Sequence, residues 1–543
     1  MFRTAVHSRI GALALFAALA VIHTWPLASN PAGLSRNSNA DTVLNEWIVA
    51  WVAHQAPRDP SRLWDTNIFH PEQTTLAYSE PLLIPAAMGA PLLWAGQTPV
   101  LVYNLLVLAG LTLTGWTACL LMWRWSGDLA AGVLTGVMVA FNAHMLTRLP
   151  HLQALHLEFL PPALLMLDAV LQPAAPFRRR LTCAGLLALC VVLQGATSYY
   201  TLVFTSLALF LGWLVRPEDW ATGKNRAALP ALALAAAAAV IALLPVLLPY
   251  RQLGHVRTID EVARYSASLS SYLASPARVH YPVWSVGWFG TSGDTALFPG
   301  ITALVLGCVA VGMGIAWRDK RARMAVAFGL AGVALSFGPA MPGYATLFNW
   351  IPPLQGIRNA ARFGFLLTVA LAILSGFALA ALRRRWGSAR WAQLAAVGVI
   401  VLANLDALAA PIGYVPPDRI SALHASLRGT DAVVVHIPFY SPDRLFRNAP
   451  YMLESTANWR PMLNGYSGFV PESYVQHARA LAGFPDTRSI DAIRAAGVTH
   501  IFVHDRALRD WTDNETADAV PRSPDLQQIA REGDLAVYVL ARK

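Results

Sequence analysis

Charged residues are scarce in this 543-residue chain, at 13%, compared with ~25% in soluble domains. Hydrophobic residues make up 55%, and the mean hydropathy is +0.45. These values exclude a disordered chain, a fibrous protein and an ordinary cytosolic enzyme. They indicate a protein that lies largely within a lipid bilayer.

Cysteine is also scarce, and no C-x-x-C pair occurs, which excludes a thiol metal site and a disulfide framework. A P-loop and a dinucleotide-binding fingerprint are missing, which argues against an ATP-driven pump and a nicotinamide enzyme. The formal net charge of +10 comes from short basic clusters between apolar runs, so we expect no nucleic-acid partner. The four cysteines lie in apolar runs and are expected to be small buried residues: Cys119, Cys183, Cys190 and Cys308.

About eleven apolar runs approach the length that a helix needs to cross the ~30 Å core of a bilayer. The first, 10–28, follows Arg3 and Arg9 but precedes no A-x-A cleavage site, so we expect a retained span and not a signal peptide. Residues 81–96 are too short and proline-broken to cross, which is typical of an interfacial or re-entrant helix. The predicted spans are 10–28, 98–122, 128–146, 155–172, 181–195, 198–215, 228–249, 297–317, 324–340, 363–382 and 391–411.

Basic clusters fall in every second loop of this arrangement, as the excess of Lys and Arg in cytoplasmic loops requires. We therefore expect a multi-pass protein of the inner (cytoplasmic) membrane with a cytoplasmic N-terminus. The clusters are Arg3/Arg9, Arg124, Arg178–Arg180, Arg216/Lys224/Arg226, Arg318/Lys320/Arg321/Arg323 and Arg383–Arg385/Arg390. The loops expected outside are 29–97, 147–154, 250–296, 341–362 and everything after 411.

The last part of the chain, 412–543, is richer in charge and holds no run that could span. Its sequence pattern predicts a strand at 431–438, a helix at 489–496, a strand at 498–504, a helix at 526–532 and a strand at 535–540. The fold class predicted is an α-helical polytopic membrane protein with a small C-terminal α/β extracytoplasmic domain. The membrane domain is expected over 1–411 and the second domain over 412–543.

The first outside loop holds an acidic residue, Asp41, just before an amphipathic stretch. Trp47 and Trp51 share one face of that stretch, so we expect a helix lying along the membrane interface with its aromatic side chains down. A carboxylate at its start can act as a general base on an acceptor hydroxyl or hold a divalent metal, Mg or Mn. The competing interpretation is that Asp41 only caps the helix.

Three further groups of this loop are candidates. His70 and Glu72 flank one proline, and Glu80 starts the interfacial helix. Glu80 also fits a first-turn carboxylate that stabilises the helix dipole, and His70 and Glu72 also fit solvated loop residues.

A cluster of histidines bridges two predicted spans. His144, Arg148, His151, His156 and Glu158 fall within fifteen residues, but their spacing is not that of an H-E-x-x-H zinc motif. We therefore interpret His151, His156 and Glu158 as the polar edge of a substrate cavity.

Two outside loops carry arginines suited to an anion. One holds Arg264 and Tyr265, and the other holds Arg358 and Arg362, four apart at the start of a span. The spacing predicts that Arg358 and Arg362 share a helix face beside a helix N-terminus, as a phosphate site requires. The alternative is a pair of lipid headgroup anchors.

The expected arrangement has an inside N-terminus, a first span, a long outside loop opening with Asp41, an interfacial helix begun by Glu80-Pro81-Leu82, many further spans and an outside C-terminal domain. It resembles the C-type (GT-C) membrane glycosyltransferases, which include protein O-mannosyltransferases and the aminoarabinose transferases of lipid A. Short motifs occur along nearly the whole chain: Leu76-Ala-Tyr-Ser-Glu80, Gln194-Gly-Ala-Thr-Ser-Tyr-Tyr200, Tyr265-Ser-Ala, Phe298-Pro-Gly300, Leu335-Ser-Phe-Gly-Pro339, Arg358-Asn-Ala-Ala-Arg362-Phe and Asn464-Gly-Tyr-Ser-Gly468. By these motifs the chain is most similar, within that superfamily, to the bacterial YfhO-like branch.

This resemblance implies transfer of a sugar from a polyprenyl-phosphate donor to a glycan, lipid or protein acceptor. By the same resemblance, Asp41 is the catalytic or metal-binding acid. Many members carry two adjacent acids there, whereas Thr42 follows Asp41 here, so Glu46 or Glu80 is the candidate for the second. The alternatives are a non-catalytic envelope-assembly protein and a lipid or sugar transporter.

Overall fold

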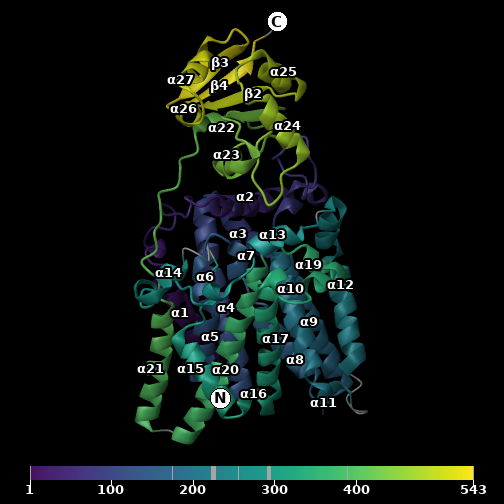
Figure 1. Cartoon of the computed structure of the whole chain (residues 1–543), viewed down its shortest axis with the longest axis vertical. Coiled ribbons are helices and arrows are strands. Elements are labelled where there is room, and N and C mark those ends of the chain that lie inside the picture. Colours follow the sequence, from purple (N-terminus) through teal and green to yellow (C-terminus); the bar gives the residue numbers. More distant parts are fainter. Residues whose placement is uncertain are drawn as a thin grey trace. The chain divides into compact units, whose positions relative to one another are not determined.

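The computed structural model describes residues 2–173, 175–221, 228–254, 256–289, 295–387 and 389–541. It divides into two compact units, shown in Figure 1. The helical unit comprises Met1–Pro31 and Asn104–Gly413, and the loop–sheet unit comprises Ala32–Tyr103 and Tyr414–Lys543. Lys224 and Arg226 of the predicted basic clusters lie outside the described residues.

Each predicted span contains a helix, and the protein is a mainly helical, multi-pass membrane protein. Among the described residues, five helical stretches are long and apolar enough to cross a membrane: Pro99–Ser126, Leu129–Thr147, Phe177–Thr197, Ala228–Leu253 and Ala360–Trp386. The other predicted spans hold shorter or less apolar helices. The span helices are α1 (Phe2–His23), α4 (Pro99–Ser126), α5 (Leu129–Ala140), α8 (Leu160–Val170), α9 (Phe177–Thr197), α10 (Tyr199–Leu214), α12 (Ala228–Leu253), α15 (Ile301–Gly312), α17 (Lys320–Ser336), α20 (Phe365–Trp386) and α21 (Arg390–Ala407).

Helix α20 forms the centre of the helical unit and packs against α5, α15 and α17. Small residues allow these close approaches. A Cβ added at Gly332 of α17 would lie 2.7 Å from the Leu366 Cβ, and one at Gly329 would lie 2.6 Å from the Ala370 Cβ. Short helices connect the long ones: α6 (Ala143–Thr147), α7 (Leu152–Leu155), α11 (Pro217–Trp220), α13 (Ile259–Arg264), α14 (Val286–Phe289), α16 (Ile315–Arg318), α18 (Tyr344–Trp350) and α19 (Pro352–Gln355).

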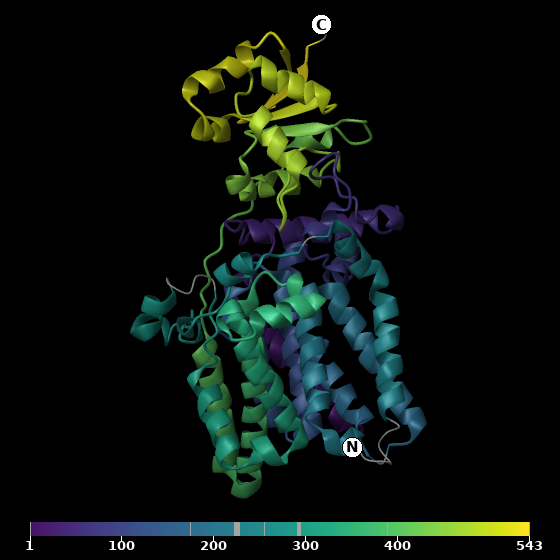
Figure 2. The ribbon, with the colours of Figure 1, turned by 45° about the vertical axis from the view of Figure 1, so that its right-hand side comes forward.

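An ion-pair network joins loops that were predicted to share the cytoplasmic side. The buried Arg216 guanidinium lies 2.7 Å from Asp168 and 2.6 Å from Asp219, and Arg321 lies 2.9 Å from the second Asp168 oxygen. In Figure 2 the connections at this end of the helical unit lie together, near the N-terminus. Further pairs are Lys320–Asp219, Arg323–Glu218 and Arg383–Asp128.

The loop–sheet unit contains a four-stranded sheet of order β1-β2-β4-β3, in which only β1 and β2 run parallel. The strands are β1 (Val434–Ile437), β2 (His500–His504), β3 (Leu526–Glu532) and β4 (Leu535–Leu540). The helices are α2 (Ala40–Gln55), α3 (Leu83–Trp94), α22 (Ala422–Ala425), α23 (Ala449–Ser455), α24 (Glu472–Ala480), α25 (Thr487–Ala495), α26 (Asp505–Trp511) and α27 (Asn514–Ala519).

Four of the five elements predicted in the tail are confirmed as β1, α25, β2 and β4. The helix predicted over 526–532 is wrong, because these residues form β3. Gly533, with φ of 58°, and Asp534 make a two-residue turn that pairs Glu532 with Leu535. The hairpin therefore overrides the helix propensity of this segment.

The first loop is joined to the sheet by backbone hydrogen bonds. The amide of His70 donates to the carbonyl of Met462 at 2.9 Å, and the amide of Met462 donates to the carbonyl of Asn67 at 2.8 Å. Segment 461–464 is in turn bonded to Val434 of β1 through two hydrogen bonds of 2.8 and 3.0 Å. The compact unit that holds the C-terminal sheet therefore includes residues of the first loop.

Gly465 provides a direct test of this junction. A Cβ at this position would lie 2.8 Å from three carbons of the Phe69 ring. We expect Gly465→Ala to lower the free energy of unfolding by ~1–3 kcal/mol, measured by thermal unfolding of the purified protein. Gly413→Ala is the control, because an added Cβ there meets nothing within 4 Å. Equal unfolding temperatures for the two variants would contradict the packing described.

Candidate functional site

Asp41 lies in the first turn of α2, where its carboxylate accepts a hydrogen bond from the Tyr466 hydroxyl at 2.7 Å. The capping interpretation of Asp41 is wrong, because the Asn39 side chain caps the helix and accepts from the Asp41 amide at 2.9 Å. The Asp41 carboxylate therefore does not cap the N-terminus of the helix. An O–H donor at this distance orients it.

Tyr466 is held in place by the residues before it. The Asn464 side chain is fully buried, accepts from the His436 amide at 2.7 Å and donates to the His436 carbonyl at 3.0 Å. Gly465 packs against the Phe69 ring. The motif Asn464-Gly-Tyr therefore ties β1, the first loop and Asp41 together. The motif was recognised in the sequence only as part of a resemblance, so the contact of Tyr466 with Asp41 was not predicted.

Helix α2 differs from the amphipathic interfacial helix that was predicted. Every residue from Thr42 to Ala53 is buried, so no polar face remains exposed over this stretch. Trp47 and Trp51 do stack, with ring centroids 6.2 Å apart, and Trp51 also contacts Trp459 at 5.6 Å. The aromatic side chains that were assigned to the membrane surface thus take part in packing within the protein.

Glu46 is enclosed one turn after Asp41. Burial raises the pKa of Glu46 to about 8, although the side chains of Ser35 and Asn37 act in the opposite direction. Ser35 donates to its carboxyl group at 3.4 Å, and the Asn37 amide nitrogen, turned toward Glu46, reaches both carboxyl oxygens at 3.0 and 3.2 Å. Glu46 is therefore neutral at pH 7.

A divalent metal at Asp41 does not fit these residues. Mg²⁺ and Mn²⁺ require several oxygen ligands around one point, whereas the Asp41 carboxylate accepts a hydrogen bond from the Tyr466 hydroxyl. Within the described residues, Asp41 belongs to no group of three His, Cys, Asp or Glu side chains whose ligand atoms gather within 4.8 Å.

The other candidates of the first loop lie away from a helix start. Helix α3 begins at Leu83, so the interpretation of Glu80 as its first-turn carboxylate is wrong, and the Glu80 side chain is buried. His70 and Glu72 lie within electrostatic range of His477 of α24. Burial lowers the pKa of His70.

Arg358 and Arg362 do not share a helix face, contrary to the prediction. Arg358 precedes a 3₁₀ turn at Ala360–Gly364, and α20 starts only at Phe365. The arginines instead lie over two aromatic rings, Arg358 at 4.9 Å from the centroid of Tyr265 and Arg362 at 4.8 Å from that of Tyr200. Cation–π contacts of this kind fix a guanidinium without neutralising it.

Tyr200 links the two arginines. Its hydroxyl oxygen accepts hydrogen bonds from the backbone amides of Arg358, at 3.0 Å, and Asn359, at 3.1 Å, while its ring supports Arg362. We call Arg358, Arg362, Tyr200 and Tyr265 the arginine site. Tyr200 was quoted only as part of a motif, and its role was missed.

The arginine site retains its positive charge. Over the residues that the structure describes, neither Arg358 nor Arg362 forms an ion pair with a carboxylate, and Nε of Arg362 is buried without a hydrogen bond. The buried His144 imidazole lies within electrostatic range of Arg148, His151 and Arg362. Cationic and imidazole groups from two loops predicted to be outside thus gather with His144 at one end of the helical unit, and this concentration suits an anion.

The remaining predicted site residues are less suited to binding a substrate. His156 and Glu158 form a buried pair, with Nδ1 and Oε1 2.9 Å apart, and the second ring nitrogen of His156 faces the Leu106 carbonyl at 3.1 Å. The His156–Glu158 pair therefore stabilises the packing of this segment against α4. Arg264 is exposed at the end of α13.

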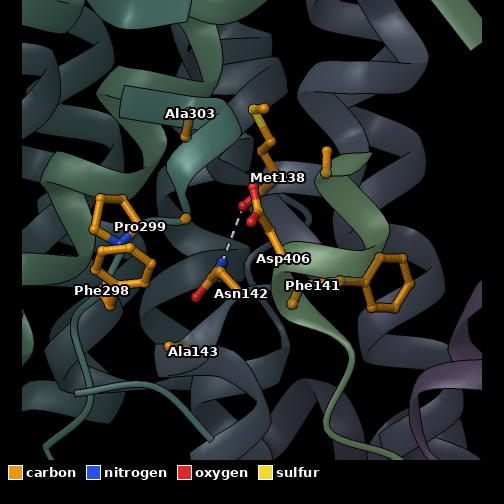
Figure 3. A pocket seen from close by; sticks show the side chains of 11 residues that line it. Met138, Phe141, Asn142, Ala143, Phe298, Pro299, Ala303 and Asp406 are labelled. Atoms are coloured by element: carbon orange, nitrogen blue, oxygen red, sulfur yellow. Dashed lines mark hydrogen bonds between the residues drawn. The ribbon is translucent and has the colours of Figure 1, made fainter. Parts of the chain in front are cut away.

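A small pocket of the helical unit is lined by residues of α5, α15 and α21 and the loops beside them, as Figure 3 shows. Its one carboxylate, Asp406, is fully engaged, since one oxygen pairs with His280 at 3.1 Å and the other accepts from the Thr302 amide at 2.7 Å. Asp406 therefore stabilises the start of α15.

The sequence matches no protein-family model and no curated protein. Solved structures do match. The arabinofuranosyltransferase AftD from Mycobacteria is 17% identical over 98% of this chain, with a TM-score of 0.58. The chain has the fold of the GT-C membrane glycosyltransferases.

Two further structures share this fold. The oligosaccharyltransferase AglB from Archaeoglobus fulgidus, solved with an inhibitory peptide and a dolichol-phosphate, is 12% identical over 98% of this chain, with a TM-score of 0.51. ArnT from Cupriavidus metallidurans is 15% identical over 97%, with a TM-score of 0.50. The chain spans 40% of the length of AftD, 74% of AglB and 98% of ArnT.

The raised pKa of Glu46 predicts a pH-dependent stability. The folded state holds this proton more tightly than the unfolded state, so the free energy of unfolding falls as pH rises from 4.5 to about 8. Glu46→Gln removes the ionisation and should raise the unfolding temperature by ~3 °C or more at pH 8.5, with little effect at pH 4.5. Thermal unfolding at both pH values measures this.

The exposed Glu515 supplies the control for that comparison. Glu515→Gln should leave the two unfolding temperatures unchanged. A Glu46→Gln variant that is equally or less stable than the natural protein at pH 8.5 would show that Glu46 is ionised in the folded state.

Proposed function

We propose that the protein transfers a sugar from a polyprenyl-phosphate donor to an acceptor hydroxyl at the outer face of the inner membrane. The observation that carries the proposal is the arginine site, because its two guanidiniums have no carboxylate partner among the residues that the structure describes. The glycosyltransferase fold supports it. The N-terminus is cytoplasmic in this proposal, and the YfhO-like branch is the narrower placement that the motifs favour.

The arginine site binds the donor phosphate in this mechanism. As the bond between the anomeric carbon and the phosphate oxygen breaks, negative charge develops on the leaving phosphate. Arg358 and Arg362 stabilise that charge by charge-assisted hydrogen bonds. Tyr200 and Tyr265 hold both guanidiniums in place.

Asp41 is the general base. Its carboxylate takes the proton of the acceptor hydroxyl while the hydroxyl oxygen forms the new bond to the anomeric carbon. Tyr466 orients the carboxylate by donating a hydrogen bond to one of its oxygens. Glu46 is a poor second base because it is already protonated at neutral pH.

The role of Asp41 is tested by Asp41→Asn. We expect sugar transfer in proteoliposomes to fall by at least ~100-fold, because an amide cannot accept the proton. Asp59→Asn is the control, since Asp59 lies in the same loop and caps a short turn, as asparagine also does. Full activity of Asp41→Asn would refute its assignment as the base.

The phosphate role is tested by Arg362→Gln, which keeps a polar side chain but removes its charge. We expect the KM for the lipid-linked donor to rise by ~10-fold or more, while the KM for the acceptor changes little. Arg251→Gln is the control, because Arg251 is exposed at the end of α12. An unchanged donor KM would remove the phosphate role of Arg362.

A further inference from the structure

The loop–sheet unit contains a cluster of metal-ligating side chains that the proposed reaction does not use. His424 of α22, His436 of β1 and Glu454 of α23 bring one ligand atom each within 4.8 Å of one another. His504, at the end of β2, lies beside them. Four separate elements of the chain thus converge on one point.

The distances in this cluster are measured from a single carboxylate oxygen. Oε2 of Glu454 lies 3.4 Å from Nε2 of His424, 3.7 Å from Nδ1 of His436 and 3.8 Å from Nε2 of His504. The last two nitrogens are 3.0 Å apart. Ligands at ~2.0–2.1 Å from a tetrahedral Zn²⁺ are themselves separated by roughly 3.4 Å. The measured spacings bracket that value.

Key atoms of the cluster lack hydrogen-bond partners among the described residues. Both ring nitrogens of His424, which is fully buried, and Oε2 of Glu454 make none. A buried polar atom without a partner costs ~1–3 kcal/mol, so three of them at one point require an explanation. A bound cation satisfies those atoms that face the centre of the cluster.

Stacking fixes the imidazoles in place. His424 lies flat on Phe502 at a centroid distance of 4.5 Å and an angle of 7°, and His436 lies on Tyr451 at 4.7 Å and 18°. The Asn464 side chain also holds the backbone of His436. The ligand atoms are therefore preorganised, as the outer groups of metal sites usually ensure.

We propose that His424, His436 and Glu454 bind a Zn²⁺ ion, with His504 as the fourth ligand. Imidazole and carboxylate together suit Zn²⁺, and four protein ligands make a closed, structural site. The ion would cross-link α22, β1, α23 and β2. This inference is independent of sugar transfer and concerns the stability of the unit that carries Asp41 and Tyr466.

The experiment uses the full-length protein in detergent micelles. Metal content is measured by elemental analysis after removal of loosely bound ions, and affinity by Zn²⁺ competition with a chromophoric chelator. We expect one Zn²⁺ per chain, a higher unfolding temperature with Zn²⁺, and the visible spectrum of tetrahedral Co²⁺ after substitution. A natural protein that binds neither ion at this stoichiometry overturns the proposal, whatever the variants do.

Two variants locate the ion. Glu454→Gln and His424→Gln should weaken Zn²⁺ binding by more than the ~10–100-fold that loss of a supporting residue costs. His500→Gln, on the same strand as His504 but bonded to Thr499, should bind as the natural protein does. Zn²⁺ that binds equally well to all variants lies elsewhere and contradicts the proposal. If a variant does not fold, the Co²⁺ spectrum of the natural protein decides.

Discussion

The loop–sheet unit depends on the hydrogen bonds that join segment 67–70 to segment 461–464. These bonds add a piece of the first loop to the edge of the C-terminal sheet beside β1. The same strip continues through Asn464 and Gly465 to Tyr466, whose hydroxyl meets Asp41. The position of the acid therefore follows from the sheet and not from helix α2 alone. Two residues separated by 425 positions form one hydrogen-bonded pair.

The helical unit holds its basic side chains in two different environments. At one end, arginines and lysines are neutralised by carboxylates, as in the contacts of Arg216 with Asp168 and Asp219. In the arginine site, Arg358 and Arg362 rest on aromatic rings instead. Ion pairs hold loops together, whereas guanidiniums without carboxylates attract an anion. The pairing of Asp168 also removes an ionisable group that a transporter mechanism would use.

Local pattern predicted much of this structure. Long apolar runs located the helices of the spans, and short apolar runs located β1, β2 and β4, because each follows from the burial of consecutive residues. The segment 526–532 was misassigned because Gln527, Gln528, Arg531 and Glu532 are good helix formers, and the turn at Gly533 was overlooked.

The functional contacts were harder to predict, because they are long-range. Asp41 and Arg358 were identified as residues, but their partners Tyr466 and Tyr265 come from distant segments. The chain around Arg358 bends before the helix begins. The four-residue spacing between Arg358 and Arg362 therefore wrongly predicted that their side chains share a helix face. The histidine–glutamate cluster spans 80 residues without a motif spacing, and only the folded sheet brings it together.

The most direct test of the account is a double-mutant cycle between Asp41 and Tyr466. Asp41→Asn, Tyr466→Phe and the double variant are compared by thermal unfolding and by the rate of sugar transfer. A hydrogen bond to a carboxylate predicts a coupling free energy of ~1 kcal/mol or more, and a loss of transfer in the double variant no greater than that in Asp41→Asn. Additive effects in both measurements would show that Tyr466 does not act through Asp41.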